Sequence, residues 1–107
     1  MAGKGARHAA VFAALGDETR LSIVDRLGTG VERSITELAL ERPITRQAMT
    51  KHLRVLEGAG IVSASKSGRQ VVFKLVPGAL RSADEYLRRV SEQWGDALGR
   101  LKAFAEK

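Results

Sequence analysis

The sequence contains no cysteine and no asparagine, and among its 107 residues there are only two histidines, two prolines and one tryptophan. The absence of cysteine excludes disulfides, thiol redox switches, zinc ribbons and cysteine nucleophiles. His8 and His52 alone are too few for a site that binds zinc, arsenic or nickel through soft or borderline ligands. We therefore predict that the protein carries no metal and no other cofactor.

Long apolar runs are also missing, because no segment approaches the ~18 residues that a membrane-spanning helix requires. The start of the chain pairs Lys4 and Arg7 with the short apolar run AAVFAALG. This resembles a secretory signal, but Asp17 and Glu18 interrupt the run at once. We therefore expect a cytoplasmic protein without a membrane partner. Residues 1–6 hold two glycines and no periodic apolar pattern, which predicts a mobile leader.

Length and charge permit a small nucleic-acid-binding protein without proving one. Residues 1–107 suffice for a single domain, and at this size oligomerisation would add much to its stability. Lysine and arginine number 18 against 12 aspartates and glutamates, so the net charge is +6. That balance favours a polyanionic partner.

Catalytic motifs are weak. The Ser63-x-x-Lys66 spacing of serine acyl enzymes falls on a predicted strand and lacks its companion motifs. Asp84, Glu85 and Glu92 sit on a charged helix surface without a nucleophile and base beside them. We predict that the protein is not an enzyme.

The segment 44–62, which we call the reader segment, has two faces of opposite chemistry. Its apolar face follows helical spacing and comprises Met49, Leu53 and Leu56. Its other face has no acidic residue, and every member can donate a hydrogen bond: Gln47, Thr50, Lys51 and Arg54. Thr45 is placed to cap the first free amides, and Gly58 and Gly60 mark the end. We predict a helix short enough to lie in a DNA groove.

Segments on both sides of the reader segment fit a winged helix. A short helix at 36–41, capped by Thr36, is expected to precede it across the connection 42–44, as in a helix-turn-helix. Strands at 61–66 and 70–76 are expected to form a hairpin with a basic tip, where Gly68 needs a positive φ. The predicted fold is mainly α with a small β-hairpin.

The periodicity also predicts which side chains are buried. Asp17 is expected to cap a helix that buries Leu21, Ile23, Val24 and Leu27. Residues 34–35 are expected to form one short strand. In the second hairpin strand, alternation predicts that Val71, Phe73 and Leu75 share a covered face and that Val72 lies on the open side.

The predicted contacts to DNA fall into two classes. Phosphate is expected to meet cations on the reader segment and at the hairpin tip, namely Lys51, Arg54, Lys66 and Arg69. Base edges are expected to meet Arg46, Gln47 and Thr50, with guanine suited to arginine and adenine to glutamine. Thr45 and His52 complete the set, although for His52 we favour packing with a backbone hydrogen bond over a phosphate contact.

The C-terminal helix, predicted at 79–105, repeats its apolar residues every seven positions. The two rows of this heptad pattern are Leu80, Leu87, Trp94 and Leu101, and Ala83, Val90, Ala97 and Phe104. A helix roughly 35 to 40 Å long exceeds what a domain this small can cover with its own residues. We therefore predict a homodimer with this helix in its interface. Gly95 and Gly99 indicate either a close helix approach or a weaker final segment.

From about 9 to 75 the chain resembles the ArsR-type winged-helix repressors, through ALGDETRLSIVDRL, TELA, TRQAMTKHLRVLEGAGIV and KSGRQVVFKL. The resemblance implies a homodimer that binds an operator and leaves it when a signal arrives. It also implies that both terminal helices, with Phe12 on the first, form the dimer interface. Two reader helices related by a two-fold axis would bind a pseudo-palindromic site with half-sites ~34 Å apart.

Members of that family that sense metals carry cysteines before the reader helix or an Asp/His/Glu set on the terminal helix. This sequence has Glu37-Leu38-Ala39-Leu40 at the first place and no histidine at the second, so we predict a regulator that does not respond to metals. A small-molecule effector near Trp94 is an open alternative to a plain core role for that residue. The alternative function is a winged-helix interaction module that binds an acidic protein surface. RNA is disfavoured because the predicted contact face has no aromatic residue for base stacking.

Overall fold

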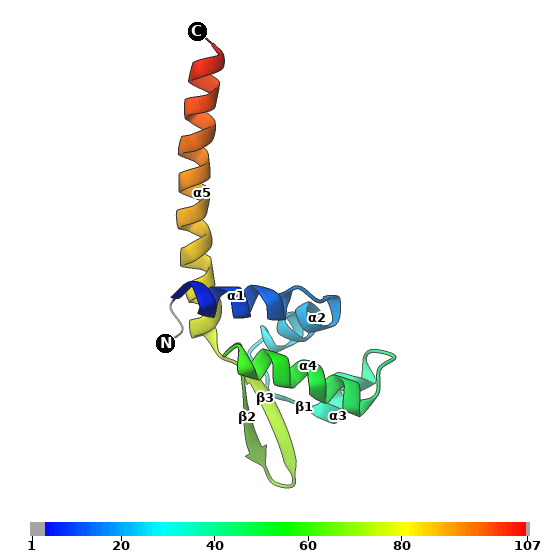
Figure 1. The fold of residues 1–107 in the computed structure, drawn as a ribbon. Helices are drawn as coiled ribbons and strands as arrows, with labels where there is room; N and C mark the ends of the chain where they lie inside the picture. The colour runs from blue at the N-terminus through cyan, green and yellow to red at the C-terminus, as the bar shows by residue number, and fades with distance from the viewer. Residues whose placement is uncertain (1–3, 107) are drawn as a thin grey trace.

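The structure is a computed structural model that describes residues 4–106, in which five helices accompany a three-stranded antiparallel sheet (Figure 1). In chain order the elements are α1 (Lys4–Leu15), α2 (Glu18–Leu27), β1 (Arg33–Ser34), α3 (Ile35–Leu40), α4 (Arg46–Gly58), β2 (Val62–Ser67), β3 (Gln70–Leu75) and α5 (Pro77–Ala105). The predicted mainly α fold with a β-hairpin is confirmed.

Helix α1 begins at Lys4, so the predicted leader is wrong for residues 4–6, and residues 1–3 lie outside the described range. The alanine-rich segment that follows has high helix propensity, which carries the helix back through Gly5. Asp17 caps α2 as predicted, accepting a hydrogen bond from the Arg20 amide at 3.0 Å. Ile23 and Leu27 are buried, whereas Leu21 is 47% exposed because it points about 200° away from Ile23 around the helix.

The N-terminus of α3 differs from the prediction by two residues. Ser34, not Thr36, is the cap: its hydroxyl accepts from the Glu37 amide, and the Glu37 carboxylate accepts from the Ser34 amide at 3.0 Å. This reciprocal pair is the capping box, in which a serine precedes a glutamate by three positions. Consequently Ile35 is helical, and the short predicted strand is Arg33–Ser34.

Both capping carboxylates make stability depend on pH. Hydrogen bonds from the Arg20 amide to Asp17 and from the Ser34 amide to Glu37 are the main reasons that the pKa of each carboxyl lies below its ordinary value. The unfolded chain therefore binds these protons at a higher pH than the folded chain does. The stabilisation is present above the ordinary carboxyl range, around pH 4, and is lost as the pH falls through the folded values.

We therefore expect Glu37→Gln to flatten the acid limb of the stability curve between about pH 5 and pH 2. Chemical unfolding midpoints measured across that range test this. Glu92→Gln is the matched control, because Glu92 is exposed on α5 and caps no helix. Acid limbs that are parallel in wild type and Glu37→Gln would contradict the prediction.

The sheet has the strand order β1-β3-β2. Ser67 pairs with Gln70 across a two-residue turn in which Gly68 has φ +65°, as predicted, and only glycine enters that region without strain. Val72 is buried and Val71 is exposed, the reverse of the prediction. Val72 lies in the central strand, between Ser34 of β1 and Ser65 of β2, so that its two neighbouring strands help to cover it.

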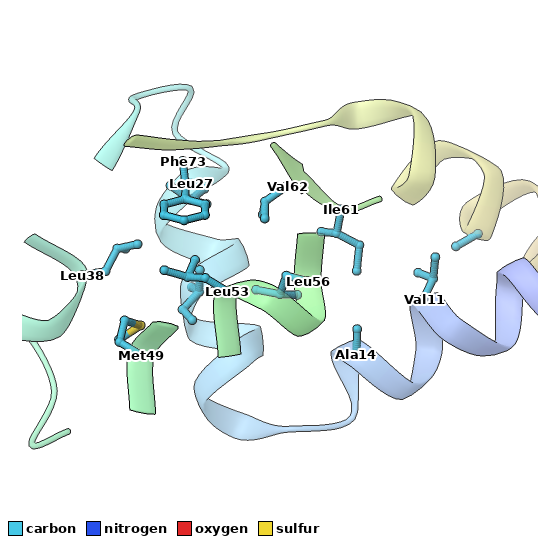
Figure 2. Packing of buried hydrophobic residues seen from close by; sticks show 12 residues of the cluster. Val11, Ala14, Leu27, Leu38, Met49, Leu53, Leu56, Ile61, Val62 and Phe73 are labelled. Carbon is cyan, nitrogen blue, oxygen red and sulfur yellow. The ribbon is translucent and has the colours of Figure 1, made fainter. Parts of the chain in front are cut away.

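The core lies between α1, α2, the reader helix α4 and the sheet. Met49, Leu53 and Leu56 of α4 are fully buried, which confirms the predicted apolar face, and Leu38 of α3 is fully buried in the same core. Figure 2 shows Leu53 and Leu56 between the α1 side chains Val11 and Ala14 and the pair Leu38 and Met49. Each such leucine or methionine contributes roughly 1.5 to 3 kcal/mol by leaving water, so the inner face of α4 is held firmly.

Helix α5 extends well beyond this body (Figure 1), and the molecule measures 67 × 33 × 23 Å. It starts two residues before the predicted position, because Pro77 occupies the first helical turn, where its missing N–H costs nothing. Its near half packs on α1, where His8 is buried, its Nε2 lying 3.1 Å from the Ser82 hydroxyl and its ring beside Tyr86. Among the described residues, no helix is long and apolar enough to cross a membrane.

Candidate nucleic-acid interface

The face of α4 that points away from the core carries the predicted polar residues. Gln47, Lys51 and Arg54 are exposed and follow one another by four and three positions, so they form one row on the outside of the helix. Thr45 caps the helix as predicted, its hydroxyl oxygen accepting from the Ala48 amide at 3.0 Å. The row is therefore presented by a helix whose opposite side is anchored in the core.

Two residues of this face already have partners within α4. The Thr50 hydroxyl donates to the Arg46 carbonyl at 2.8 Å, which leaves its oxygen able to accept from a base amino group. Arg54 forms an exposed ion pair with Glu57 at 3.1 Å, which the sequence prediction did not include although the spacing of three residues reveals it. Exposed pairs of this kind contribute little, so Arg54 can exchange Glu57 for a phosphate at small cost.

The hairpin of β2, β3 and the turn between them, which we call the wing, shares a concavity with the first turn of α4. Arg46 and Arg69 both line it, together with Ser34, Thr36 and Gln70, and its volume is about 200 Å³. Lys66 is exposed on β2 next to the turn. The structure thus brings the predicted residues of the reader helix and the wing to neighbouring surfaces, and no acidic residue lines the concavity between them.

His52 has a different environment from the predicted one. Its Nδ1 accepts from the Arg20 guanidinium at 3.2 Å and lies 3.7 Å from the Asp17 carboxylate, so its partner is a side chain and not the backbone. Arg20 and His52 are separated by 32 positions, and no local sequence pattern links them. The imidazole faces α2 on the flank of α4, between the core side and the exposed row.

The predicted dimer residues divide between the two halves of α5. Ala83 is buried, and Phe12, Leu80 and Val90 are half-buried near the body, where the Phe12 ring lies 5.9 Å from that of Tyr86. Leu87, three residues before Val90, is 51% exposed; farther out, Ala97 is half-buried and three large side chains are exposed to water: Trp94 (65%), Leu101 (63%) and Phe104 (80%). The prediction missed Leu98, exposed at 59%, although it follows Trp94 by four positions on the same side of the helix.

We also searched the described residues for a metal site and for a ligand cavity outside α4 and the wing. Among residues 4–106, no group of three or more histidine, aspartate or glutamate side chains lies close enough together to hold a metal ion. A cavity of about 310 Å³ lies where α1 meets the end of α4 and the start of α5, and its lining includes Arg7, His8 and Ser82.

Comparison with known proteins agrees with this architecture. A family model described as a helix-turn-helix domain matches residues 15–63. The uncharacterised HTH-type transcriptional regulator YuzN of Bacillus subtilis is 44% identical over 70 residues, which cover 60% of this chain and 76% of YuzN. Among solved structures, an ArsR-like transcriptional regulator from Rhodococcus is 36% identical with a TM-score of 0.84, and the match covers 97% of each chain.

A further solved relative is a homodimer. The winged helix-turn-helix DNA-binding domain Mb0332 of Mycobacterium bovis is 25% identical to this chain, with a TM-score of 0.66. The match covers 86% of this chain and 92% of the Mycobacterium domain.

Proposed function

The chain belongs to the ArsR-type winged helix-turn-helix transcriptional regulators, and from this premise we propose that it acts as a dimeric repressor on a pseudo-palindromic operator. Membership makes it a DNA-binding regulator of transcription and not an enzyme. The observation that carries the specific proposal is the exposed donor row of α4, set beside a basic wing and backed by fully buried Met49, Leu53 and Leu56.

The chemistry of each side chain determines its proposed role in binding bases or phosphates. Gln47 can donate to N7 and accept from N6 of adenine, and Arg46 can donate twice to guanine. Thr50 can accept from a base amino group while it donates within the helix. The cations Lys51, Arg54, Lys66 and Arg69 neutralise phosphates and fix the register of the complex. Thr45 holds the first turn of α4 in place, and His52 supports the helix from its flank.

The proposed dimer rests on the unpartnered half of α5. Trp94, Leu98, Leu101 and Phe104 expose more than half of their surfaces, and a monomer rarely leaves such a stripe to water. The homodimeric state of the Mycobacterium relative supports a second copy as the partner. Two copies related by a two-fold axis would present two α4 helices to half-sites about one DNA turn, ~34 Å, apart.

The proposal also covers the signal to which the regulator responds and its location in the cell. We propose that the signal is not a metal, because the sequence has no cysteine and because both histidines already hold side-chain partners, Ser82 and Arg20. A small-molecule effector that releases the protein from DNA is the expected alternative signal. The proposed location is the cytoplasm.

Selection from a random duplex library tests the function directly. The protein is expected to enrich an inverted repeat and to bind it at least about 1,000-fold more tightly than scrambled duplex at physiological salt. Equal affinity for both duplexes would contradict sequence-specific regulation and would favour an acidic protein surface as the partner.

The wing makes a separate prediction about salt. Lys66→Ala is expected to weaken selected and scrambled duplex alike and to lower the slope of log K against log salt by about 1 per chain, because one phosphate contact releases about one counterion. Fluorescence anisotropy over a salt series measures this. Lys74→Ala is the matched control, because Lys74 is exposed on β3 but lines a hollow at the end of α2, away from the wing tip. Identical slopes for the two variants would remove the wing from the interface.

A further inference from the structure

Arg20 lies on α2, outside the reader helix, yet its guanidinium contacts two other helices, α1 and α4. Its Nε donates to the Ala14 carbonyl at 2.6 Å, and its Nη2 donates to the Ala13 carbonyl at 3.4 Å. Both carbonyls belong to the last turn of α1, where a helix leaves C=O groups without helical partners and favours a positive charge. The remaining Nη1 donates to Nδ1 of His52 on α4 at 3.2 Å.

This contact determines which ring nitrogen of neutral His52 carries the proton. A guanidinium can only donate, so the Nδ1 that accepts from it is unprotonated, and the ring proton of neutral His52 is on Nε2. Asp17 holds the backbone of Arg20, because its Oδ2 accepts from the Arg20 amide at 3.0 Å; the same oxygen lies 3.7 Å from Nδ1, too far for a hydrogen bond. The His52 side chain is only 23% exposed, so water competes weakly for the contact.

We propose that Arg20 is a positioning residue for DNA binding, which ties the reader helix through His52 to the end of α1 without touching DNA itself. The inference rests on the proposed use of α4 as the reader. Helix α1 packs on α5, where the Phe12 and Tyr86 rings lie 5.9 Å apart, and α5 carries the stripe of the proposed dimer, so the Arg20 contact joins that interface to the direction of α4. Discrimination between half-site spacings should therefore depend on Arg20.

The competing explanations make different predictions. If Arg20 bound phosphate directly, its loss would lower the salt slope by about 1 per chain, and lysine would restore binding. If Arg20 only stabilised the fold, its loss would reduce the fraction of active protein and leave spacing preference unchanged. A positioning role predicts an unchanged salt slope and no rescue by lysine, because one ammonium cannot reach both carbonyls and the imidazole in the planar arrangement of a guanidinium.

The central experiment is a double-mutant cycle on the full chain, with the duplex that wild type selects as the probe. Arg20→Ala and His52→Ala are each expected to weaken binding about tenfold, and the double variant by less than about twofold beyond either single variant. His52→Asn keeps an acceptor near the position of Nδ1, so it is expected to bind within about threefold of wild type. Additive losses, or equal losses for His52→Asn and His52→Ala, would overturn the proposal, and the asparagine comparison does not require Arg20→Ala to fold.

Two further measurements separate this inference from the proposed function. Duplexes with one base pair added or removed between half-sites should be rejected less strongly by Arg20→Ala than by wild type, and an unchanged preference would count against positioning. If wild type selects no duplex, the proposed function fails, but nitrogen-15 NMR of the imidazoles still tests the contact. With only two histidines, His8→Gln identifies the His52 signals. Wild type should show the Nε2-protonated form, and an Nδ1-protonated form would refute the contact itself.

Discussion

Leu101→Lys is expected to convert the protein from a dimer to a monomer and to weaken operator binding at least about 100-fold. Leu101 lies in the apolar stripe of the outer half of α5 and is 63% exposed in the single chain. In a two-fold interface each substitution occurs twice, so two ammonium groups would have to leave water or separate the helices, at a cost of several kcal/mol each. A monomer presents one reader helix and loses half of the base contacts. Sedimentation equilibrium and anisotropy titration measure the two effects.

The control for Leu101→Lys must match its change in charge. Glu92→Gln also raises the net charge by one, and Glu92 is exposed and about 180° around α5 from Leu101 at 100° per residue. It is expected to remain a dimer and to bind DNA at least as tightly as wild type. The added positive charge of Leu101→Lys would by itself strengthen DNA binding, so a loss can only come from the interface. A dimeric Leu101→Lys variant with normal affinity would disprove the role of the stripe.

Local patterns in the sequence predicted the elements that position the interface. The buried stripe of α4, its Thr45 cap and the positive φ of Gly68 all follow from neighbours within seven residues, where helix period, hydroxyl caps and turn geometry act. The predicted start of α3 was wrong by only two residues, and the reason for this error is also local. Ser34 replaced Thr36 as the cap because the capping box needs a glutamate three positions later, and Glu37 satisfies that only for Ser34.

Contacts between distant segments were not predictable in this way. Val72 is buried because the two-residue strand β1 pairs with β3 beside it, and such a short strand has almost no sequence pattern of its own. The bond from Arg20 to His52 depends on how α1, α2 and α4 pack, so the sequence supported only a general packing role for His52. The sequence could predict the candidate DNA-contacting face because its residues lie on one helix. It could not predict the contacts that hold this helix in place, because they depend on the packing of α1, α2 and α4.

Gln47→Ala is expected to remove sequence preference while leaving non-specific affinity intact. A glutamine that pairs with both N6 and N7 of adenine contributes about 1 to 3 kcal/mol of discrimination at each half-site. A dimer loses that contribution twice, so the ratio of affinities for selected and scrambled duplex should fall at least about 30-fold. Because glutamine is neutral, the salt slope should not change. Competition titrations against both duplexes measure the ratio, and base substitutions in the selected site identify the adenine whose replacement the variant no longer penalises.

Gln93→Ala is the matched control, because Gln93 is an exposed glutamine on α5, far along the chain from the reader helix. It should leave the ratio unchanged. Thr45→Ala is a poor substitute for Gln47→Ala, since the Thr45 hydroxyl caps α4 and its loss would cost about 1 kcal/mol of stability in addition to any contact with DNA. If Gln47→Ala weakened selected and scrambled duplex by the same factor, the side chain would be acting on the backbone. Base discrimination would then have to come from Arg46 and Thr50, or from the shape of the duplex.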